Sequence, residues 1–222
     1  NLLAGIEPDR AGSVGNPFGD WIGAQIRTDV YGWVAPDDHR LAARLAWTDA
    51  RLSHYRNGVY GALFVAAACG AAVRADTVDE CLTAGLSVVP AESRYAAAIA
   101  FGRDLAASGR PLAECLDELV AAYGPHHWVH VLNNAALVAF ALIRSGGDFD
   151  TAITTVVTGG WDTDSNGATV GSICGALGGT AAIDRRWTDP LHNRLASSIP
   201  GFDGIGFDVL AERTMSAMLT PP

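Results

Sequence analysis

The sequence contains no lysine, so every one of its 15 basic side chains is an arginine. The 24 acidic residues outnumber them and give a formal net charge of −9 at pH 7. A surface that binds nucleic acid needs a basic face to neutralise phosphates, so this balance argues against nucleic acid as a partner. We attribute the absence of lysine to coding bias and give it no functional meaning.

Cysteine is scarce, and the four residues at positions 69, 81, 115 and 174 form no short pairing motif. Three of the four lie in apolar, helix-like stretches, so we expect buried free thiols in the reducing cytoplasm. The N-terminus also lacks the basic region and apolar core of a secretory signal peptide. These absences together favour a cytoplasmic location.

The sequence offers one candidate for a membrane-spanning segment. The one candidate for a membrane span, residues 166–183, is rich in glycine and contains Thr, Ser and Asn as well. Two aspartates precede it directly, and a bilayer-spanning helix needs about 20 predominantly apolar residues. We therefore expect a buried helix of a soluble protein here, and no membrane partner.

Helix-like segments follow one another along the chain, whereas sustained period-two alternation is missing. The pattern predicts an all-α fold, a compact, irregular helical bundle that forms a single domain over residues 1–222. The chain before residue 36 could be loop or broken helix, and the β-branched run 154–157 leaves a strand open there. Helices are expected over residues 36–54, 59–74, 77–84, 91–107, 111–123, 128–145, 149–157, 166–183, 189–197 and 207–219.

Oxygen-bearing side chains gather within a glycine-flanked segment. Asp162 and Asp164 are two residues apart, and the hydroxyl of Ser165 and the amide of Asn166 follow directly. Hard cations such as Mg²⁺ bind clustered oxygen ligands of this kind. We expect a metal-binding loop that ends in the N-terminus of the next helix.

Glycine recurs at every fourth position of that next helix, so these residues share one helix face. Each glycine costs a helix about 1 kcal/mol relative to alanine, and a compensating gain is expected. The gain that we predict is the close approach of another helix backbone to this face. The glycines are at positions 167, 171, 175 and 179.

Two other interpretations of the acidic loop stay open. Asp162 and Ser165 are good N-cap residues, so the pattern can be the chemistry of a helix start alone. The spacing also imitates the start of an EF-hand calcium loop. That loop needs a bidentate Glu at its twelfth position, where this chain has Ile173.

Two clusters on one later segment need partners. His126, His127 and His130 could form a zinc cluster, since the first and last share a helix face. They lack the glutamate of a zincin motif, and exposed or capping histidines are ordinary at a helix start. Asn133 and Asn134 lie on an otherwise apolar helix, so their amides are expected to face a cleft or to cap a neighbouring helix.

Together these segments resemble the ADP-ribosylglycohydrolase family. Its C-terminal signature, a glycine-preceded D-x-D-[TS]-N before a small-residue helix, is similar to residues 160–166, where Trp161 separates the glycine pair from the first aspartate. Its T/S-H segment, whose histidine lies in the ADP-ribose cleft, resembles residues 52–54 followed by 57–61. Its G-A-x-x-R stretch near the phosphates resembles residues 23–27.

The resemblance implies a Mg²⁺-dependent hydrolase that cleaves an N- or O-glycosidic bond at the anomeric carbon of ADP-ribose or a related riboside. Two Mg²⁺ ions are expected in the complete site, with Mn²⁺ as an alternative. The metal ligands implied here are Asp162, Asp164 and Ser165. The residues implied to contact an ADP-ribose-containing or ribosylated substrate are His54, Asn57, Gly58, Tyr60, Gly23, Gln25, Asn134 and Asn166.

The chain departs from the family at the N-terminal T-D-D motif, which supplies the other half of the metal centre. Thr48-Asp49 lacks the second aspartate, and Asp37-Asp38 lacks the threonine and belongs to a helix start. The family's catalytic acid is expected upstream of residue 1, so no catalytic residue is assigned. We therefore expect the C-terminal two-thirds of the fold, with an upstream segment or chain completing the site.

Two alternatives follow from this departure. The chain could be a non-catalytic family member that binds a ligand or serves a structural role, as the J1-crystallins of the family do. It could also belong to a related hydrolase that acts on small N-ribosides, such as nucleoside or nicotinamide derivatives. The sequence does not identify the acceptor or leaving group.

Overall fold

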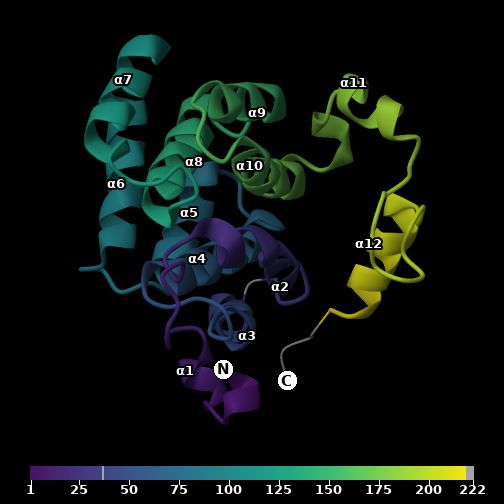
Figure 1. Ribbon diagram of the computed structural model, residues 1–222. Helices are drawn as coiled ribbons and strands as arrows, with labels where there is room; N and C mark the ends of the chain where they lie inside the picture. The colour runs from purple at the N-terminus through teal and green to yellow at the C-terminus, as the bar shows by residue number, and fades with distance from the viewer. Residues whose placement is uncertain (37, 219–222) are drawn as a thin grey trace.

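The computed structural model describes residues 1–36 and 38–218, and helices make up its architecture (Figure 1). Within these two ranges there is no β-strand. Two isolated antiparallel bridges occur instead, between Trp21 and His130 and between Leu195 and Ile205. The predicted all-α fold is confirmed.

The elements are α-helices and short 3₁₀ helices, the latter labelled η. The first half of the chain contains η1 (Leu2–Ala4), α1 (Pro8–Ala11), η2 (Ile22–Arg27), α2 (Asp29–Trp33), α3 (His39–Ala50), α4 (Asn57–Ala72), α5 (Val78–Leu86) and α6 (Arg94–Ala107). The second half contains α7 (Leu112–Tyr123), α8 (Val131–Ser145), α9 (Phe149–Thr158), α10 (Thr163–Gly178), η3 (Thr180–Ala182), α11 (Arg185–Thr188), η4 (Asp189–Leu191) and α12 (Phe207–Ser216).

Side-chain caps fix where several helices begin. Asp38, Thr77, Ser93 and Asp148 each accept a hydrogen bond from the backbone N–H three residues further along the chain. Each bond satisfies one of the N–H groups that a first helical turn leaves unpaired. Thr77 and Asp148 are the caps at the starts of α5 and α9, two helices that the sequence predicts.

The core forms around α4 and α8, two helices that are buried along most of their length. α4 packs against η2, α2, α3 and α5, while α8 packs mainly against α6 and α9. Phe64, Tyr95 and Phe140 are fully buried between these helices. Each apolar side chain of this size stabilises the fold by about 1.5–3 kcal/mol, and the resulting frame positions η2 and α10.

Close backbone approach occurs at glycines other than the predicted ones. A Cβ added to Gly102 of α6 would lie 2.2 Å from the carbonyl oxygen of Ala136 in α8. In α10, a Cβ added to Gly167, Gly171 or Gly175 would meet only side-chain atoms, at 3.4–3.9 Å. The predicted helix approach to α10 is therefore wrong, because side chains of α9 and of the following segment cover this partly exposed face.

Several predicted boundaries also need correction. α3 ends at Ala50 and not at His54, because amides of the N-terminal segment bind the carbonyls of Arg51 and Ser53. α10 ends before Gly179, whose φ of 66° lies in the left-handed region. Residues 192–197 are not helical, and the residues before 36 form broken helix.

The remaining predictions concern the ends of three segments. The run 154–157 is helical within α9, so the strand alternative is wrong. α12 ends at Ser216, and residue 219, to which this helix was predicted to extend, lies outside the described residues. Asp37, predicted to lie in the first turn of the first long helix, lies outside them as well.

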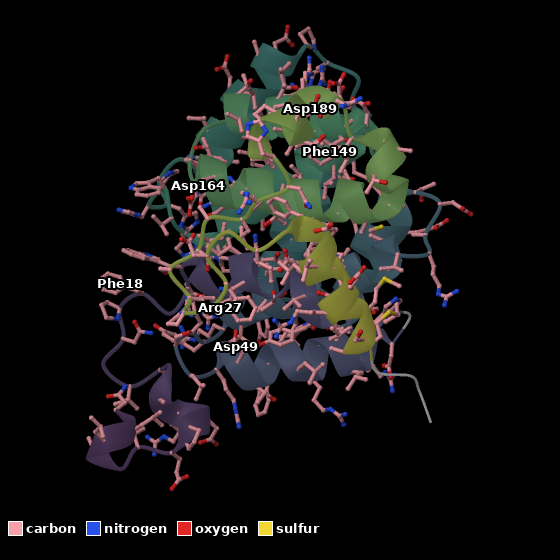
Figure 2. All side chains as sticks on the ribbon, turned by 90° about the vertical axis from the view of Figure 1, so that its right-hand side faces the viewer. Phe18, Arg27, Asp49, Phe149, Asp164 and Asp189 are labelled. Carbon is pink, nitrogen blue, oxygen red and sulfur yellow. The ribbon has the colours of Figure 1, made fainter. Side chains whose placement is uncertain are left out.

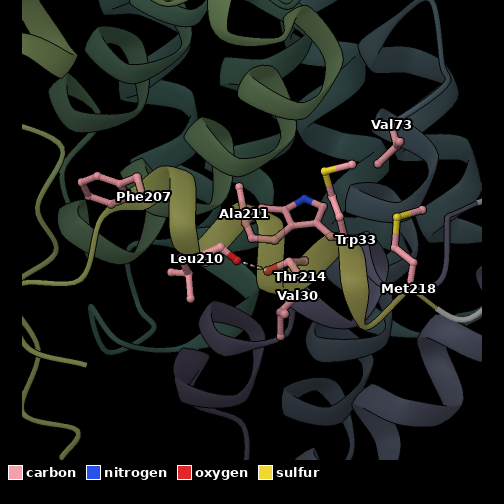
Figure 3. Close-up of a pocket in the computed structure, with 9 residues that line it drawn as sticks. Val30, Trp33, Val73, Phe207, Leu210, Ala211, Thr214 and Met218 are labelled. Carbon is pink, nitrogen blue, oxygen red and sulfur yellow. Dashed lines mark hydrogen bonds between the residues drawn. The ribbon is translucent and has the colours of Figure 1, made fainter. Parts of the chain in front are cut away.

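A C-terminal arm follows α10 and carries α11 and α12 alongside the body (Figure 1). It is attached where Arg186 and the Trp187 indole both donate hydrogen bonds to the Asp150 carboxylate. α12 contains no buried residue. An apolar groove of about 510 Å³ separates it from Trp33 and Val73 of the body (Figure 3).

All four cysteines are buried and unpaired, which confirms the predicted free thiols. Burial raises the pKa of the Cys81 thiol to about 11 and that of Cys174 to about 12. Such thiols are inert packing residues at neutral pH. No helix within the described residues combines the length and apolar character that a bilayer crossing requires.

Candidate functional site

A two-hydrogen-bond contact brings the segment before η2 against the start of α8. The N–H of Ile22 donates to the carbonyl of Val129, and the N–H of Val131 donates to the carbonyl of Asp20, both at 2.9 Å. This contact is the antiparallel bridge between Trp21 and His130. It holds η2, with its G-A-x-x-R stretch, next to the N-terminus of α8.

A cleft of about 320 Å³ opens beside this contact. One part of its wall is polar and contains Gly23 of η2, Ser53 and His54 of the turn after α3, and Asp162 at the start of α10. The rest of the wall is apolar and is formed by Phe18, Trp21, Ile22, Ile26 and Val129. The cleft therefore unites residues from all three segments that carry the family resemblance.

The acidic loop enters α10 through a strained turn. Gly160 and Trp161 have φ values of 79° and 56°, both in the left-handed region. For a residue with a Cβ, such as Trp161, this conformation costs about 1–2 kcal/mol. Strained backbone conformations of this kind cluster at functional sites, where the surrounding contacts stabilise them. The turn delivers Asp162 to the cleft wall.

Asp162 occupies the N-cap position of α10, yet its side chain makes no cap hydrogen bond. The segment therefore begins a helix, as the helix-start interpretation expects, but Asp162 does not supply the cap hydrogen bond. The EF-hand interpretation is wrong, because residues 163–173 are helical and do not form a calcium-binding loop.

The loop offers a donor set that fits a hard cation. Asp162 is 7% exposed, Ser165 is buried, and Asp164 is exposed. Burial raises the pKa of the Asp162 carboxyl, a hydrogen bond with Ser165 opposes the rise, and the Asp164 carboxylate adds to it. The ion pairs among the described residues do not include Asp162, and a divalent cation would provide a positive partner for its carboxylate.

The described residues do not supply a full metal cage. Among them, no group of three or more His, Cys, Asp or Glu side chains is arranged to hold a metal ion. Asp162 and Asp164 thus make at most half of the two-metal centre that the family resemblance implies.

A buried amide braces the acidic loop from behind. Asn134 Oδ1 accepts the backbone N–H of Asp162 at 3.2 Å and the Asn166 side-chain amide at 2.7 Å. Its Nδ2 donates to the carbonyls of Trp128 and His130, both at 2.8 Å. All of these hydrogen bonds connect groups within the protein, and both Asn134 and Asn166 are fully buried. Contact of either residue with substrate stays a prediction.

His54 is held by a chain of polar groups. Its Nδ1 lies 2.8 Å from Ser53 Oγ, and that oxygen accepts a 2.8 Å hydrogen bond from Arg27. Arg27 also donates to Asp49 at 2.7 Å, and Figure 2 shows these two side chains side by side below Asp164. Burial, with a smaller effect of Arg27, lowers the pKa of His54 to about 4, so the imidazole is neutral at pH 7.

Two predicted contact residues pack behind the cleft wall. Gln25 is fully buried and accepts a 2.9 Å hydrogen bond from the Tyr95 hydroxyl, while its Nε2 has no partner among the described residues. Gly58 lies within the first turn of α4. A Cβ there would lie 2.2 Å from the Gly19 carbonyl oxygen, which explains the glycine.

Asn57 and Tyr60 line a different pocket of about 390 Å³, together with Arg56 and Arg94. The backbone N–H of Asn57 donates to the Asp20 carboxylate at 2.9 Å. The structure therefore does not bring these two predicted contact residues into the cleft of His54 and Asp162.

The histidines before α8 pack as rings. His126 stacks on His130 with ring centroids 4.3 Å apart, and His127 stacks on Trp21 at 5.1 Å. His130 Nδ1 accepts the backbone N–H of Leu132 as the cap of α8. Of the two interpretations left open by the sequence, capping and packing is the one that matches these contacts.

Sequence reasoning missed the aromatic part of the cleft wall and the polar chain behind His54. Phe18 and Trp21 belong to an irregular segment without helical periodicity, so no pattern marked them. Arg27 and Asp49 were visible only as fragments of family motifs. Their 2.7 Å ion pair joins two segments 22 residues apart.

Comparison with known protein families shows which family the chain belongs to. The family model for ADP-ribosylglycohydrolase matches residues 1–220. The chain belongs to the ADP-ribosylglycohydrolase family. A curated relative from Archaeoglobus fulgidus, an uncharacterized protein, is 30% identical over 204 residues, which is 87% of this chain and 59% of the relative. The chain thus spans about three-fifths of this relative's length, and no solved structure gives a significant match.

Proposed function

We propose that the chain carries part of the active site of a hydrolase that cleaves the glycosidic bond at the anomeric carbon of ADP-ribose or a related riboside. The observation that carries this proposal is the convergence of Gly23, His54 and Asp162, from three separate segments, on one cleft. Membership of the ADP-ribosylglycohydrolase family supports it.

Asp162, Asp164 and Ser165 would hold Mg²⁺, or Mn²⁺ in its place. When bound there, a divalent ion would help to orient the ribose hydroxyls and to ionise a water molecule. The raised pKa of Asp162 supports this assignment, since it marks a buried carboxylate outside the ion pairs of the described residues.

The chain's own residues would act on the ribose. Cleavage adds water across the bond: the hydroxyl goes to the anomeric carbon and a proton goes to the leaving atom. Positive charge develops on the ring as the bond breaks. His54, neutral at pH 7, would contribute a hydrogen bond. The acid that protonates the leaving atom is not assigned.

The second half of the metal centre would come from an upstream segment or from another chain. This part of the proposal rests on the donor set of Asp162 and Asp164, beside which the described residues place no third acidic group. The same observation favours a second candidate, a non-catalytic member that binds ADP-ribose or a related riboside without cleaving it.

Calorimetric titration of ADP-ribose into this chain tests the proposal, first with Mg²⁺ and then with EDTA. We expect binding that requires the metal and is abolished by Asp162→Asn. Asp104→Asn, which removes an exposed carboxylate on α6, is the matched control and should bind normally. Equal binding in EDTA, or by the Asp162 variant, would show that the assigned metal site is wrong.

A turnover assay separates the two candidates. If Mg²⁺-dependent binding occurs without hydrolysis of ribosylated conjugates, the non-catalytic alternative is favoured for this chain. If no binding occurs, the titration is repeated with an upstream segment supplied. Recovery of binding would identify an incomplete site, and continued absence of binding would contradict both candidates.

A further inference from the structure

Four side chains form a continuous polar chain that ends in the cleft. Asp49 Oδ2 accepts from Arg27 Nε at 2.7 Å, and Arg27 Nη2 donates to Ser53 Oγ at 2.8 Å. Ser53 Oγ in turn lies 2.8 Å from His54 Nδ1. Arg27 is further fixed by a 3.2 Å hydrogen bond from Nη1 to the Gly23 carbonyl. Every member is therefore held by at least one neighbour.

The donor and acceptor properties of the four side chains fix the direction of each hydrogen bond between them. A guanidinium has only donors and a carboxylate has only acceptors, so Arg27 donates at both of its side-chain contacts. Ser53 Oγ accepts from Arg27, which leaves the hydroxyl proton to be donated. The acceptor within reach of that proton is His54 Nδ1. A neutral imidazole that accepts at Nδ1 carries its proton on Nε2.

The ring edge that carries Nε2 lies open to the cleft. A Cβ added to Gly23 would lie 3.3 Å from His54 Nε2, and both residues line the cleft wall. Because Gly23 has no side chain, no Cβ at this position of η2 covers the nitrogen. A ligand in the cleft can therefore approach it directly.

We propose that Arg27 and Ser53 are positioning residues that fix His54 in the tautomer with its proton on Nε2, so that the imidazole presents a hydrogen-bond donor to an oxygen atom of the ligand. Asp49 orients Arg27 and completes the chain. The identity of the ligand rests on the proposed function. The oxygen would then be a hydroxyl, ring or phosphate oxygen of the riboside.

This arrangement assigns His54 a definite role. With Nδ1 engaged by Ser53 and Nε2 protonated, the ring has no free lone pair for a ligand proton, so His54 does not act as a general base. The pKa of His54 is lowered to about 4, first by burial and then by Arg27, while Asp49 and Asp20 oppose the change. The imidazole therefore donates as a neutral group, and it discriminates in favour of acceptor atoms.

Nitrogen-15 NMR of the histidine-labelled chain tests the tautomer without any ligand. The Nδ1 and Nε2 signals of a neutral imidazole differ according to which nitrogen carries the proton, and the His54→Gln variant assigns the resonances by their loss. We expect a protonated Nε2 and an unprotonated Nδ1 for His54. A protonated Nδ1 would overturn the proposal.

Variants of Ser53 test whether its hydroxyl fixes the tautomer of His54. Ser53→Ala removes the donor to Nδ1, so the two nitrogen signals should move toward each other as the tautomers mix. Ser53→Thr keeps a hydroxyl and should restore the original signals. Thr48→Ala is the matched control, because its hydroxyl bonds only the Arg44 carbonyl of its own helix. Unchanged His54 signals in a folded Ser53→Ala chain would contradict the role of Ser53.

A second variant keeps the test decisive if Ser53→Ala fails to fold. Arg27→Lys retains the positive charge but not the guanidinium that links Asp49 to Ser53, and we expect the same mixing of tautomers. Retention of the pure Nε2–H tautomer in this variant would overturn the role of Arg27.

Ligand titration separates this inference from the proposed function. With Mg²⁺ and ADP-ribose, Ser53→Ala should weaken binding about three- to tenfold, the range expected for one neutral hydrogen bond. Failure of the native chain to bind ADP-ribose, with the Nε2–H tautomer present, would reject the ligand and leave the positioning role intact. Binding together with the wrong tautomer would reject the positioning role alone.

Discussion

Asn134 Oδ1 and Asn166 Nδ2 lie 2.7 Å apart and join α8 to the first turn of α10. The same oxygen accepts the backbone N–H of Asp162, so one buried amide holds both ends of the acidic turn. Asn166 Oδ1 has no partner among the described residues. The position of the proposed metal ligands thus depends on a side chain that belongs to the core.

We predict that Asn134→Ala destabilises the chain by about 2–4 kcal/mol. The change leaves two buried donors and two partly buried carbonyls without the Asn134 amide, and each unsatisfied buried group costs about 1–3 kcal/mol before relaxation. Asn133→Ala is the matched control, since this equally buried neighbour makes only contacts of 3.4 and 3.5 Å and has an unpartnered Oδ1. Urea denaturation should rank the Asn134 variant well below the Asn133 variant. Equal losses would show that Asn134 does not brace the loop.

The adjacent pair Asn133-Asn134 shows how far the sequence could lead. Polarity on an apolar helix predicted partners for both amides, and this is confirmed for Asn134, whereas Asn133 Oδ1 has no partner among the described residues. It could not identify the partners, because Asp162 and Asn166 are 28 and 32 residues away from Asn134 and only the packing of α10 on α8 brings them together. A polar residue on an apolar helix indicates that a hydrogen-bond partner is needed, and tertiary packing determines which group becomes that partner.

Glycine substitutions in α6 and α10 should have opposite effects. Gly175→Ala should stabilise the chain by up to about 1 kcal/mol, because alanine is the better helix former and the added Cβ meets only side-chain atoms at 3.6 and 3.9 Å. Gly102→Ala should destabilise it by about 1–3 kcal/mol, because the Cβ would lie 2.2 Å from the Ala136 carbonyl oxygen. Thermal denaturation of both variants measures the difference. Destabilisation by Gly175→Ala would instead support the close approach of another helix to α10 that the sequence predicted.

The same glycines explain why the fold class was predictable and the packing was not. Helical periodicity and breakers were sufficient to predict most helices, since they depend on local propensity. The spacing of Gly171 and Gly175 shows that they share a face, but not what covers it. The covering groups are the side chains of Phe149, Ile153 and Ile183, and nothing in the glycine spacing encodes them.

In the candidate site, too, the sequence predicted individual residues but not all of their positions in space. The sequence identified Asp162 and His54 through motif resemblance, and the structure brings both to one cleft. Asn57 and Tyr60 belong to the same motif as His54 but face another pocket, because α4 begins at Asn57 and turns the chain away. A short separation in sequence therefore does not ensure a shared site.

The stability of the chain should fall as the pH drops from 6.5 toward 4. Burial is the main cause that lowers the pKa of both His54 and His130 to about 4, and both rings accept a hydrogen bond at Nδ1 that protonation would remove. Between these pH values the unfolded chain binds more protons than the folded chain, so the free energy of unfolding decreases with acidification. The contribution is complete above pH 6.5. Urea titrations at a series of pH values measure the slope.

A double variant checks which groups produce that slope. His54→Gln combined with His130→Asn keeps polar side chains, including a cap acceptor at the start of α8, and should flatten the dependence between pH 4 and 6.5. His192→Asn is the control for substituting an exposed histidine, and asparagine tolerates its φ of 50°. If the double variant keeps the slope of the native chain, other groups control the pH dependence.

Gly23→Ala should weaken ligand binding while leaving the fold intact. The φ of Gly23 lies outside the left-handed region, so alanine fits the backbone, but the added Cβ would lie 3.3 Å from His54 Nε2. The methyl group would cover the nitrogen that we propose as the donor, and loss of one neutral hydrogen bond should reduce ADP-ribose affinity about three- to tenfold. Gly175→Ala, with its methyl group outside the cleft, is the matched control. Calorimetry on both variants, with thermal denaturation as a check of folding, measures the effect. Unchanged affinity in a folded Gly23→Ala chain would mean that the ligand does not reach His54.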